Sequence, residues 1–456
     1  MFERVLVANR GVAAVRVAQT LRRLGVSWVA VYSEADADHA YVREADEAVR
    51  LGPGPARESY LSRDAVIAAL HATGCDAVHP GYGFLAEDPL FAAAVIDAGA
   101  TFIGPSPAHI QTMGDKVAAR KVMAAAGVPV LPASGAIPDD VEDWSQWLDP
   151  IGFPVLVKAS AGGGGIGMQR VESAKDLTRA VERTRQMAAR AFGDDTVYLE
   201  RCLDRARHVE LQLIGDRDGH VRYLGARDCS SQRRHQKIIE EAPAPALDSN
   251  VHEHVVSAVV AALSAMGYQG LGTVEMLLDD TGRYAFLEMN TRLQVEHGVT
   301  EAVTGLDLVE LQVRVAAGDD IDELISEPVA PRGHAIEVRI YAEDSVRFFP
   351  SPGTLTVFDL PQRAGTTVTT HVSTGTQISS NYDPMLALMV VTGDDRADAI
   401  DQTLTALEAV VIEGVATNVK FLQRLIDDQS FRKVEHHTTF AEALARTPSH
   451  DPSPDT

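Results

Sequence analysis

Lysine is scarce in this chain of 456 residues, which has only seven, and cysteine is scarcer still, with three. The cysteines, Cys75, Cys202 and Cys229, have no metal-ligand spacing and no even count, so we expect a reducing, cytoplasmic setting. No apolar run reaches the about 18 residues of a membrane span, and no basic-then-apolar leader opens the chain. The net charge of −23 excludes a general nucleic-acid-binding protein.

The few lysines coincide with other polar motifs. Lys116, Lys158 and Lys237 each lie in a segment that stands out for a second reason given below. An acidic protein that binds an anion must place positive charge where the anion lies. The positions of these lysines therefore indicate an anionic ligand.

The segment 288–296 alternates strictly between polar and apolar residues. If it is extended, one face carries Glu288, Asn290, Arg292, Gln294 and Glu296. A solvated strand face seldom has this mixture, which is typical of a site that holds metal, anion and base in a row. Full extension would span about 26 Å, too long for one small substrate. We therefore expect the chain to curl after Asn290.

A second carboxylate supports this interpretation. Segments 272–278 and 284–289 are predicted to form a hairpin, and a two-residue turn at Thr281-Gly282 would place Glu275 opposite Glu288 with Cβ atoms about 5 Å apart. Like charges there repel unless a cation lies between them. Oxygen ligands from Glu275, Glu288 and Asn290 suit Mg²⁺ or Mn²⁺. The alternative is a hairpin with solvated acids.

The chain opens with a strand, a helix over about 12–24 and a second strand, which predicts a βαβ unit in a first α/β domain ending near residue 114. Its Asn9-Arg10-Gly11 turn lacks the glycine triplet of a dinucleotide site, so we do not expect NAD. The rest is predicted to comprise a second domain over 115–330 with a small lid at about 134–200, a third over 331–446, and a disordered tail over 447–456.

A glycine-rich loop follows the predicted strand that ends at Lys158. Gly162, Gly164 and Gly167 formally satisfy G-x-G-x-x-G, but a strand-like stretch follows where a dinucleotide fingerprint needs a helix. A hairpin whose backbone N–H groups fold over phosphates fits better, and Lys158 can reach those phosphates. The alternative is a flexible surface linker.

Residues 227–237 form a basic cluster. It is either a solvated loop or a patch that grips phosphates or neutralises the site acids. His208 alternates on a predicted strand and is equally well explained as a structural histidine. Arg339 lies among apolar neighbours and needs an anionic partner there, for which an ordinary ion pair is the default.

Six motifs together resemble those of one family. They are Asn9-Arg10-Gly11, 79–85, 113–116, 227–237, 288–297 and 332–337. Over about residues 2–440 the chain resembles the biotin carboxylase component of biotin-dependent carboxylases, within the ATP-grasp superfamily. The resemblance implies a mixed α/β and α+β fold in three parts: an N-terminal Rossmann-like domain, an ATP-grasp domain with a mobile glycine-rich lid, and a C-terminal biotin carboxylase domain.

The resemblance also implies a role for each matching residue. The ATP-binding positions match Lys116, Lys158, Gly163, Gly164, Gly165, His208, Gln232, His235, Glu275 and Glu288, with Glu200 and Leu203 near the adenine. Lys237 matches the contact to the transferred phosphoryl group, and Glu275, Glu288 and Asn290 match the metal ligands. The bicarbonate-binding positions match Arg292, Gln294 and Val295. The general base matches Glu296, and the biotin contacts match Tyr82 and Arg339.

The activity implied is carboxylation of biotin by bicarbonate through carboxyphosphate, with ATP and Mg²⁺ or Mn²⁺, as the first half-reaction of an acyl-CoA carboxylase. The chain has no Met-Lys dipeptide, so we expect biotin on a separate carrier protein, a carboxyltransferase subunit as partner, and a homodimer. The chain departs from the common family pattern at Val12, Ile166, Gly298, Leu388 and Thr438. An ATP-grasp ligase for another carboxylate and a nucleotide-sensing scaffold remain the alternatives.

Overall fold

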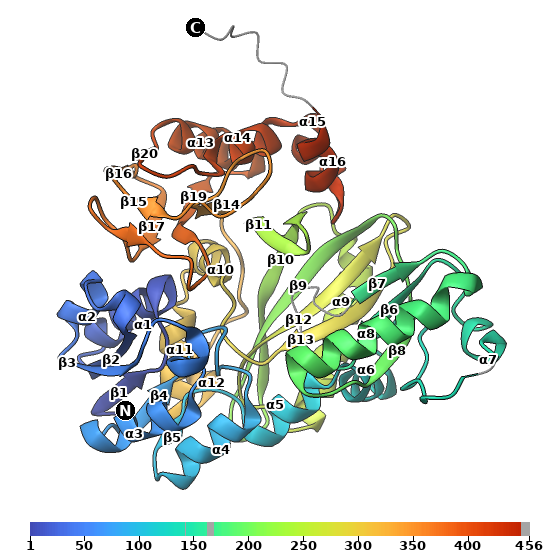
Figure 1. Ribbon diagram of the computed structural model, residues 1–456, viewed down its shortest axis with the longest axis horizontal. Helices are drawn as coiled ribbons and strands as arrows, with labels where there is room; N and C mark the ends of the chain where they lie inside the picture. The colour runs from blue at the N-terminus through green and yellow to red at the C-terminus, as the bar shows by residue number, and fades with distance from the viewer. Residues whose placement is uncertain (142, 162–167, 448–456) are drawn as a thin grey trace, which may run out of the picture.

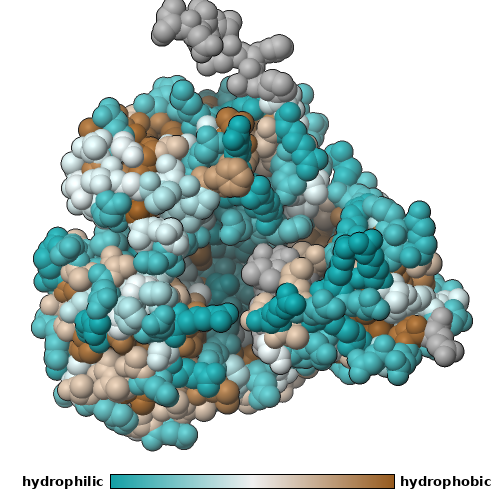
Figure 2. Space-filling model, viewed as in Figure 1, coloured by the Kyte–Doolittle hydropathy of each residue, from teal (hydrophilic) through white to brown (hydrophobic). Residues whose placement is uncertain are grey.

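The computed structural model describes residues 1–141, 143–161 and 168–447. Three lobes surround a central hollow, which Figure 2 shows from the front. In Figure 1 the N-terminal lobe lies below the C-terminal one, and a sheet and a smaller lobe lie beside them. Within the described part, no helix is long and apolar enough to cross a membrane.

The N-terminal lobe is built on a parallel five-stranded sheet of order β3-β2-β1-β4-β5. Its strands are β1 (Arg4–Val7), β2 (Ser27–Ser33), β3 (Glu47–Gly52), β4 (Ala77–His79) and β5 (Thr101–Phe102), with α1 (Gly11–Arg23), α3 (Arg63–Thr73), α4 (Pro89–Asp97) and α5 (Pro107–Gly114) between or after them. Val5, Leu6 and Val7 are fully buried, as expected for a central parallel strand covered on both faces. The predicted βαβ opening is confirmed.

An eight-stranded sheet of order β13-β12-β9-β10-β11-β14-β19-β17 forms the middle of the molecule. Its strands are β9 (Ala206–Gly215), β10 (Val221–Arg233), β11 (Gln236–Ala242), β12 (Gly270–Asp279), β13 (Tyr284–Asn290), β14 (His334–Tyr341), β17 (Thr366–Thr370) and β19 (Met385–Gly393). Because β11 pairs with β14, hydrogen bonding runs unbroken past residue 330, and the second and third parts of the chain share one sheet.

Helices flank this sheet along its length (Figure 1). They are α6 (Lys116–Ala125), α9 (Ser249–Ala265), α10 (His297–Thr304) and α11 (Leu308–Ala316), and toward the C-terminus α13 (Arg396–Glu408), α14 (Val419–Asp427) and α16 (Phe440–Arg446). Helix α6 begins at Lys116 and is capped by the side chain of Asp115. Gly127 follows it with φ +84, the left-handed conformation that favours glycine at a helix end.

The hairpin of β12 and β13 places Glu275 opposite Glu288, as predicted. The predicted turn, however, is wrong. Asp279 N–H donates to Arg283 O at 3.0 Å, so the loop has three residues rather than two. A β-bulge then leaves Leu287 unpaired between Met276 and Glu275, which shifts the register back by one. The longer turn and the bulge therefore shift the register in opposite directions, and together they restore the predicted pairing of Glu275 with Glu288.

The strand that bears Glu288 ends at Asn290, and residues 291–296 are irregular. The expected curl after Asn290 is confirmed. Glu87 of the N-terminal lobe fixes it, because its carboxylate accepts from Thr291 N–H at 3.1 Å and from Arg292 Nε at 2.7 Å. The polar residues after Asn290 thus turn into the hollow instead of running along a straight strand.

The smaller lobe holds β6 (Val155–Ala159), β7 (Met168–Val171), β8 (Val197–Arg201) and α8 (Leu177–Phe192). It has its own apolar core, to which Ile137, Val157 and Leu199 belong. A strand follows the glycine loop and pairs antiparallel with β6, Lys158 opposite Met168, so the exclusion of a dinucleotide helix was right. The described residues do not include the predicted phosphate loop, with Gly163, Gly164 and Gly165. They do not include Ile166 either.

Candidate active site

A cleft of about 590 Å³ lies between the N-terminal lobe and the long sheet. Figure 2 shows it as the hollow at the centre of the molecule. Fifteen of the predicted site residues line it: Tyr82, Lys116, Lys158, His208, Gln232, His235, Lys237, Glu275, Glu288, Asn290, Arg292, Gln294, Val295, Glu296 and Arg339. Segments far apart in sequence thus converge on one cleft.

Two residues predicted to lie near the adenine do not line this cleft. Glu200 is buried, and its carboxylate accepts from Lys158 Nζ at 2.8 Å and from Arg120 Nη1 at 2.9 Å. Leu203 lines a separate cavity beside Tyr284. Glu200 therefore orients Lys158, and contact of either residue with an adenine stays a prediction.

Lys237, on β11, is the centre of a buried charge network. Its ammonium group donates to Glu296 Oε1 at 2.7 Å, to Glu275 Oε1 at 2.9 Å and to Glu210. Burial alone would lower the pKa of Lys237, but the three carboxylates raise it well above its usual value. The lysine is therefore a permanent cation at the bottom of the cleft.

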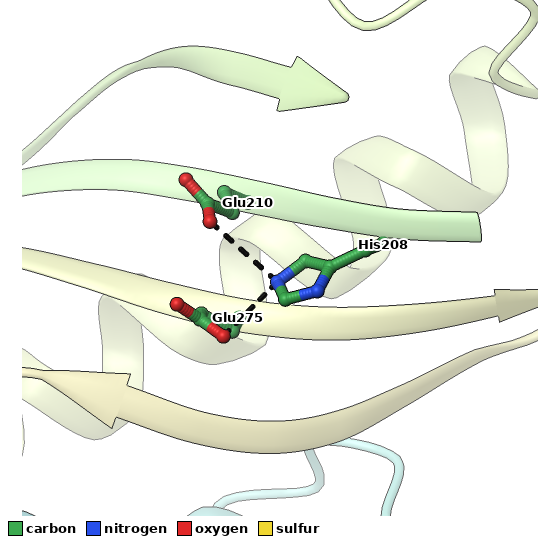
Figure 3. Close-up of side chains that lie close together, drawn as sticks. All are labelled: His208, Glu210 and Glu275. Carbon is green, nitrogen blue, oxygen red and sulfur yellow. Dashed lines mark ion pairs between the residues drawn. The ribbon is translucent and has the colours of Figure 1, made fainter. Parts of the chain in front are cut away.

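His208 lies between two of the same acids (Figure 3). Its Nε2 is 3.0 Å from Glu275 Oε2 and 3.5 Å from Glu210 Oε1, and its Nδ1 is 2.9 Å from Gln232 Nε2. Burial opposes protonation, yet the neighbouring Glu275 raises the pKa of His208 above its ordinary value. His208 therefore lines the cleft, and its contact with ATP stays a prediction.

The basic cluster is not a single phosphate-binding patch. Arg227 is fully buried and donates from Nε and Nη2 to Glu210 Oε2 at 3.0 and 2.8 Å. Arg233 pairs instead with Glu343 at 2.7 Å. The idea that the cluster neutralises site acids holds for Arg227 and Lys237, whereas Gln232 and His235 line the cleft.

Glu210 is not among the site residues predicted from the sequence. It lies directly opposite Arg227 in the β9–β10 pairing and on the same strand face as His208, two residues away. The alternation of His208 and Glu210 within an apolar strand was a signal that could have found it. Loss of either partner of a buried ion pair leaves an uncompensated buried charge, which destabilises the fold strongly. Glu210 and Arg227 therefore hold each other in place.

The proposed base, Glu296, lies between two cations. Its Oε1 accepts from Lys237, and its Oε2 accepts from Arg339 Nη2 at 2.9 Å. Burial would raise the pKa of Glu296, but Lys237 and Arg339 hold it well below its usual value. Arg339 thus has the anionic partner that its apolar strand required, and Glu296 is ionised.

The predicted metal ligands fit a hard cation by their chemistry. Glu275 and Glu288 are cross-strand partners facing one cleft, and Asn290 adds an amide oxygen on the same wall. Here Glu288 pairs with Lys116 at 2.7 Å and Glu275 with Lys237, so lysine ammonium groups neutralise both carboxylates. Oxygen donors of this kind suit Mg²⁺ or Mn²⁺.

Three family models together match nearly the whole chain. They are the biotin carboxylase N-terminal domain over residues 1–110, the carbamoyl-phosphate synthase L chain ATP-binding domain over 115–324, and the biotin carboxylase C-terminal domain over 337–443. Together with the cleft, these matches define an enzyme of the ATP-grasp class.

Relatives and solved structures indicate the same family as the family models. The biotin carboxylase of Halalkalibacterium halodurans is 47% identical over 440 residues, covering 96% of this chain and 97% of that one. The biotin carboxylase–beta-gamma-ATP complex from Campylobacter jejuni superposes with a TM-score of 0.94 at 41% identity, covering 98% of this chain and 99% of that one. The biotin carboxylase domain dimer of Hydrogenobacter thermophilus 2-oxoglutarate carboxylase, solved with MgADP and bicarbonate, gives 0.93 at 40%, covering 97% and 98%. The chain belongs to the biotin carboxylase family.

Proposed function

We propose that this chain carboxylates biotin with bicarbonate at the expense of ATP. The observation that carries the proposal is the ionised Glu296, buried between Lys237 and Arg339 at the end of a cleft lined by the ATP-binding positions. A carboxylate held in that form can accept a proton, and the two cations beside it attract the anions it must act on.

Different cleft residues would bind the nucleotide and the bicarbonate. Lys116, Lys158 and His235 would hold the phosphates of ATP, and His208 and Gln232 the nucleoside. Arg292, kept in place by Glu87, would bind bicarbonate together with Gln294 and the backbone at Val295. Mg²⁺ or Mn²⁺ at Glu275, Glu288 and Asn290 would supply positive charge to the phosphoryl oxygens.

Glu296 removes the bicarbonate proton, and the resulting oxyanion attacks the γ-phosphorus of ATP, which releases ADP. Carboxyphosphate forms and breaks down to CO₂ and phosphate, the phosphate takes the N1′ proton of biotin, and N1′ then attacks CO₂ to give carboxybiotin. Arg339 faces the biotin ureido oxygen and stabilises the negative charge that develops there, while Tyr82 lies beside the ring. Lys237 neutralises charge on the transferred phosphoryl group.

Formation of ADP with and without bicarbonate and free biotin tests this function. We expect ADP only when bicarbonate is present, and more of it with biotin. ATP cleavage that ignored both would favour a ligase for another carboxylate, and tight ATP binding without bicarbonate-dependent ADP release would favour a nucleotide-sensing scaffold.

Glu288→Gln is expected to raise the Mg²⁺ concentration for half-maximal activity by at least about tenfold, because a carboxylate ligand becomes a neutral amide. The measurement is a Mg²⁺ titration of ADP formation. Glu172→Gln, at a surface ion pair with Arg170, is the control and should leave the titration unchanged. Identical curves for both variants would remove Glu288 from the metal site.

The partners follow from the same function. We propose a biotin carboxyl carrier protein as the source of biotin, a carboxyltransferase subunit as the consumer of carboxybiotin, and a homodimer, the form named for the Hydrogenobacter domain. The final acyl acceptor is chosen by the carboxyltransferase. Co-purification with a biotinylated protein is the experiment that tests the carrier.

A further inference from the structure

Two buried glutamates face each other behind Arg339. Glu240 on β11 and Glu337 on β14 are direct partners in the antiparallel pairing, and their side chains are 0% and 1% exposed. Side chains opposite each other in such a pair have Cβ atoms about 5 Å apart. Two ionised carboxylates at that separation and depth repel strongly, and burial disfavours both charges.

The charges around the pair do not balance. Five glutamates, all at most 4% exposed, belong to the network: Glu210, Glu240, Glu275, Glu296 and Glu337. The cations among them are Lys237, Arg227, Arg339 and, when protonated, His208. The acids outnumber even this full set of cations, and they still do, by four to three, when the predicted metal ligand Glu275 and the neighbouring His208 are left out. A buried carboxylate without a compensating cation takes up a proton, so at least one of the five is neutral.

The contacts indicate which acid is neutral. Glu240 Oε1 lies 2.5 Å from Arg339 Nη2, whereas Glu337 has no ion pair in the described part of the chain. Glu337 Oε2 faces the start of α10, 2.9 Å from where a Cβ on Gly298 would lie, and its Oε1 has no described hydrogen-bond partner. Burial and the nearby Glu240 raise the pKa of Glu337 well above its usual value, whereas Arg339 opposes the effect of burial on Glu240 and its pKa rises only to about 7.

We propose that Glu240 and Glu337 hold one proton between them, carried mainly by Glu337, and that ionised Glu240 is a positioning residue for Arg339. Arg339 Nη2 is shared between Glu240 and Glu296, at 2.5 and 2.9 Å. Arg339 lines the cleft, and its Nε is buried without a hydrogen-bond partner among the described residues. Glu240 therefore holds the guanidinium of Arg339 through an ion pair of its own, in addition to the pair with Glu296.

The consequence for catalysis rests on the function proposed above. Without the charge of Glu240, Arg339 would pair with Glu296 alone, which would lower the basicity of Glu296 and turn the guanidinium away from biotin. With two ionised acids behind it, Arg339 would be drawn back from the cleft. A single shared proton avoids both outcomes.

Infrared spectroscopy of the purified full chain near neutral pH tests the proton without reference to activity. A protonated carboxylic acid has a carbonyl-stretch band that a carboxylate lacks. We expect this band in the wild type and its loss in Glu337→Gln. Glu241→Gln is the matched control, because Glu241 is also buried on β11 but pairs with His334 and Arg396, which lower its pKa against the effect of burial. A band that persists in Glu337→Gln, or is absent from the wild type, overturns the assignment.

Kinetics test the positioning role. Glu240→Gln should lower kcat for biotin carboxylation by about tenfold, as loss of an outer partner commonly does, with little change in the KM for ATP. Glu337→Gln keeps a neutral side chain of the same shape and should lose less than about threefold. Equal losses in the two variants, or a loss confined to the KM for ATP, would refute positioning by Glu240. If the wild type fails to carboxylate biotin, the function fails while the infrared result still decides the shared proton.

Discussion

Glu296→Ala should reduce bicarbonate-dependent ADP formation by two to four orders of magnitude, about the contribution of a positioned general base. The variant loses the group that takes the bicarbonate proton, but it keeps Lys237 and Arg339, which remain held by Glu275 and Glu240. ATP binding should therefore stay close to that of the wild type. Steady-state ADP release and calorimetric titration with ATP are the two measurements.

Glu323→Ala, at an exposed position on the short helix Ile321–Leu324, is the control and should change neither quantity. If Glu296→Ala retained full turnover, another group would have to be the base. A parallel loss of ATP binding would mean that Glu296 acts mainly by holding Lys237, and the catalytic assignment would fall.

Arg227→Met should lower the free energy of unfolding by about 3–5 kcal/mol, the range measured when one partner of a buried ion pair is removed. The reason is that Glu210 would keep its charge in a fully buried position with one fewer cation beside it. Gln212 and Thr300 would also lose a hydrogen-bond donor. Urea denaturation followed by circular dichroism measures the change.

Arg222→Met makes the same exchange on the same strand. Arg222 and its partner Asp322 have side chains 44% and 42% exposed, and such surface pairs contribute about 0–1 kcal/mol. The two variants thus differ in the burial of the ion pair and in the hydrogen bonds that Arg227 donates to Gln212 and Thr300. Equal denaturation midpoints would show that Glu210 is protonated or solvated rather than held as a carboxylate by Arg227.

The hairpin of β12 and β13 illustrates what local pattern can and cannot predict. The pairing of Glu275 with Glu288 followed from a count through an assumed two-residue turn, and it is correct although the turn is not. Asp279 accepts from Thr281 and Arg283 N–H groups, and Gly282 has φ +80, which favours the longer loop. The alternation of polar and apolar residues does not reveal the bulge at Leu287. A bulge is defined by how one strand pairs with its neighbour, and that pairing is not visible in the residue pattern of a single strand.

The site residues that were found share one property, and those that were missed share another. Glu288, Asn290, Arg292, Gln294 and Glu296 lie in one short segment, where a repeat of two exposes an unusual run of polar groups. The residues missed were Glu87, Glu210, Glu240 and Glu337, and apart from the alternation of His208 with Glu210 the sequence pattern around them gives no sign of their roles. Their importance comes from contacts made across strands and lobes, which depend on the tertiary fold.

The unbroken sheet from β13 to β17 has a consequence for dissecting this protein. A fragment ending near residue 330 would strip β14 from β11 and leave a row of unsatisfied amide and carbonyl groups along a new edge. Such an edge invites self-association, so the ATP-cleaving half should not be obtainable as a well-behaved fragment. The lobe around β6, β7 and β8, with a core of its own, is the natural place to cut instead.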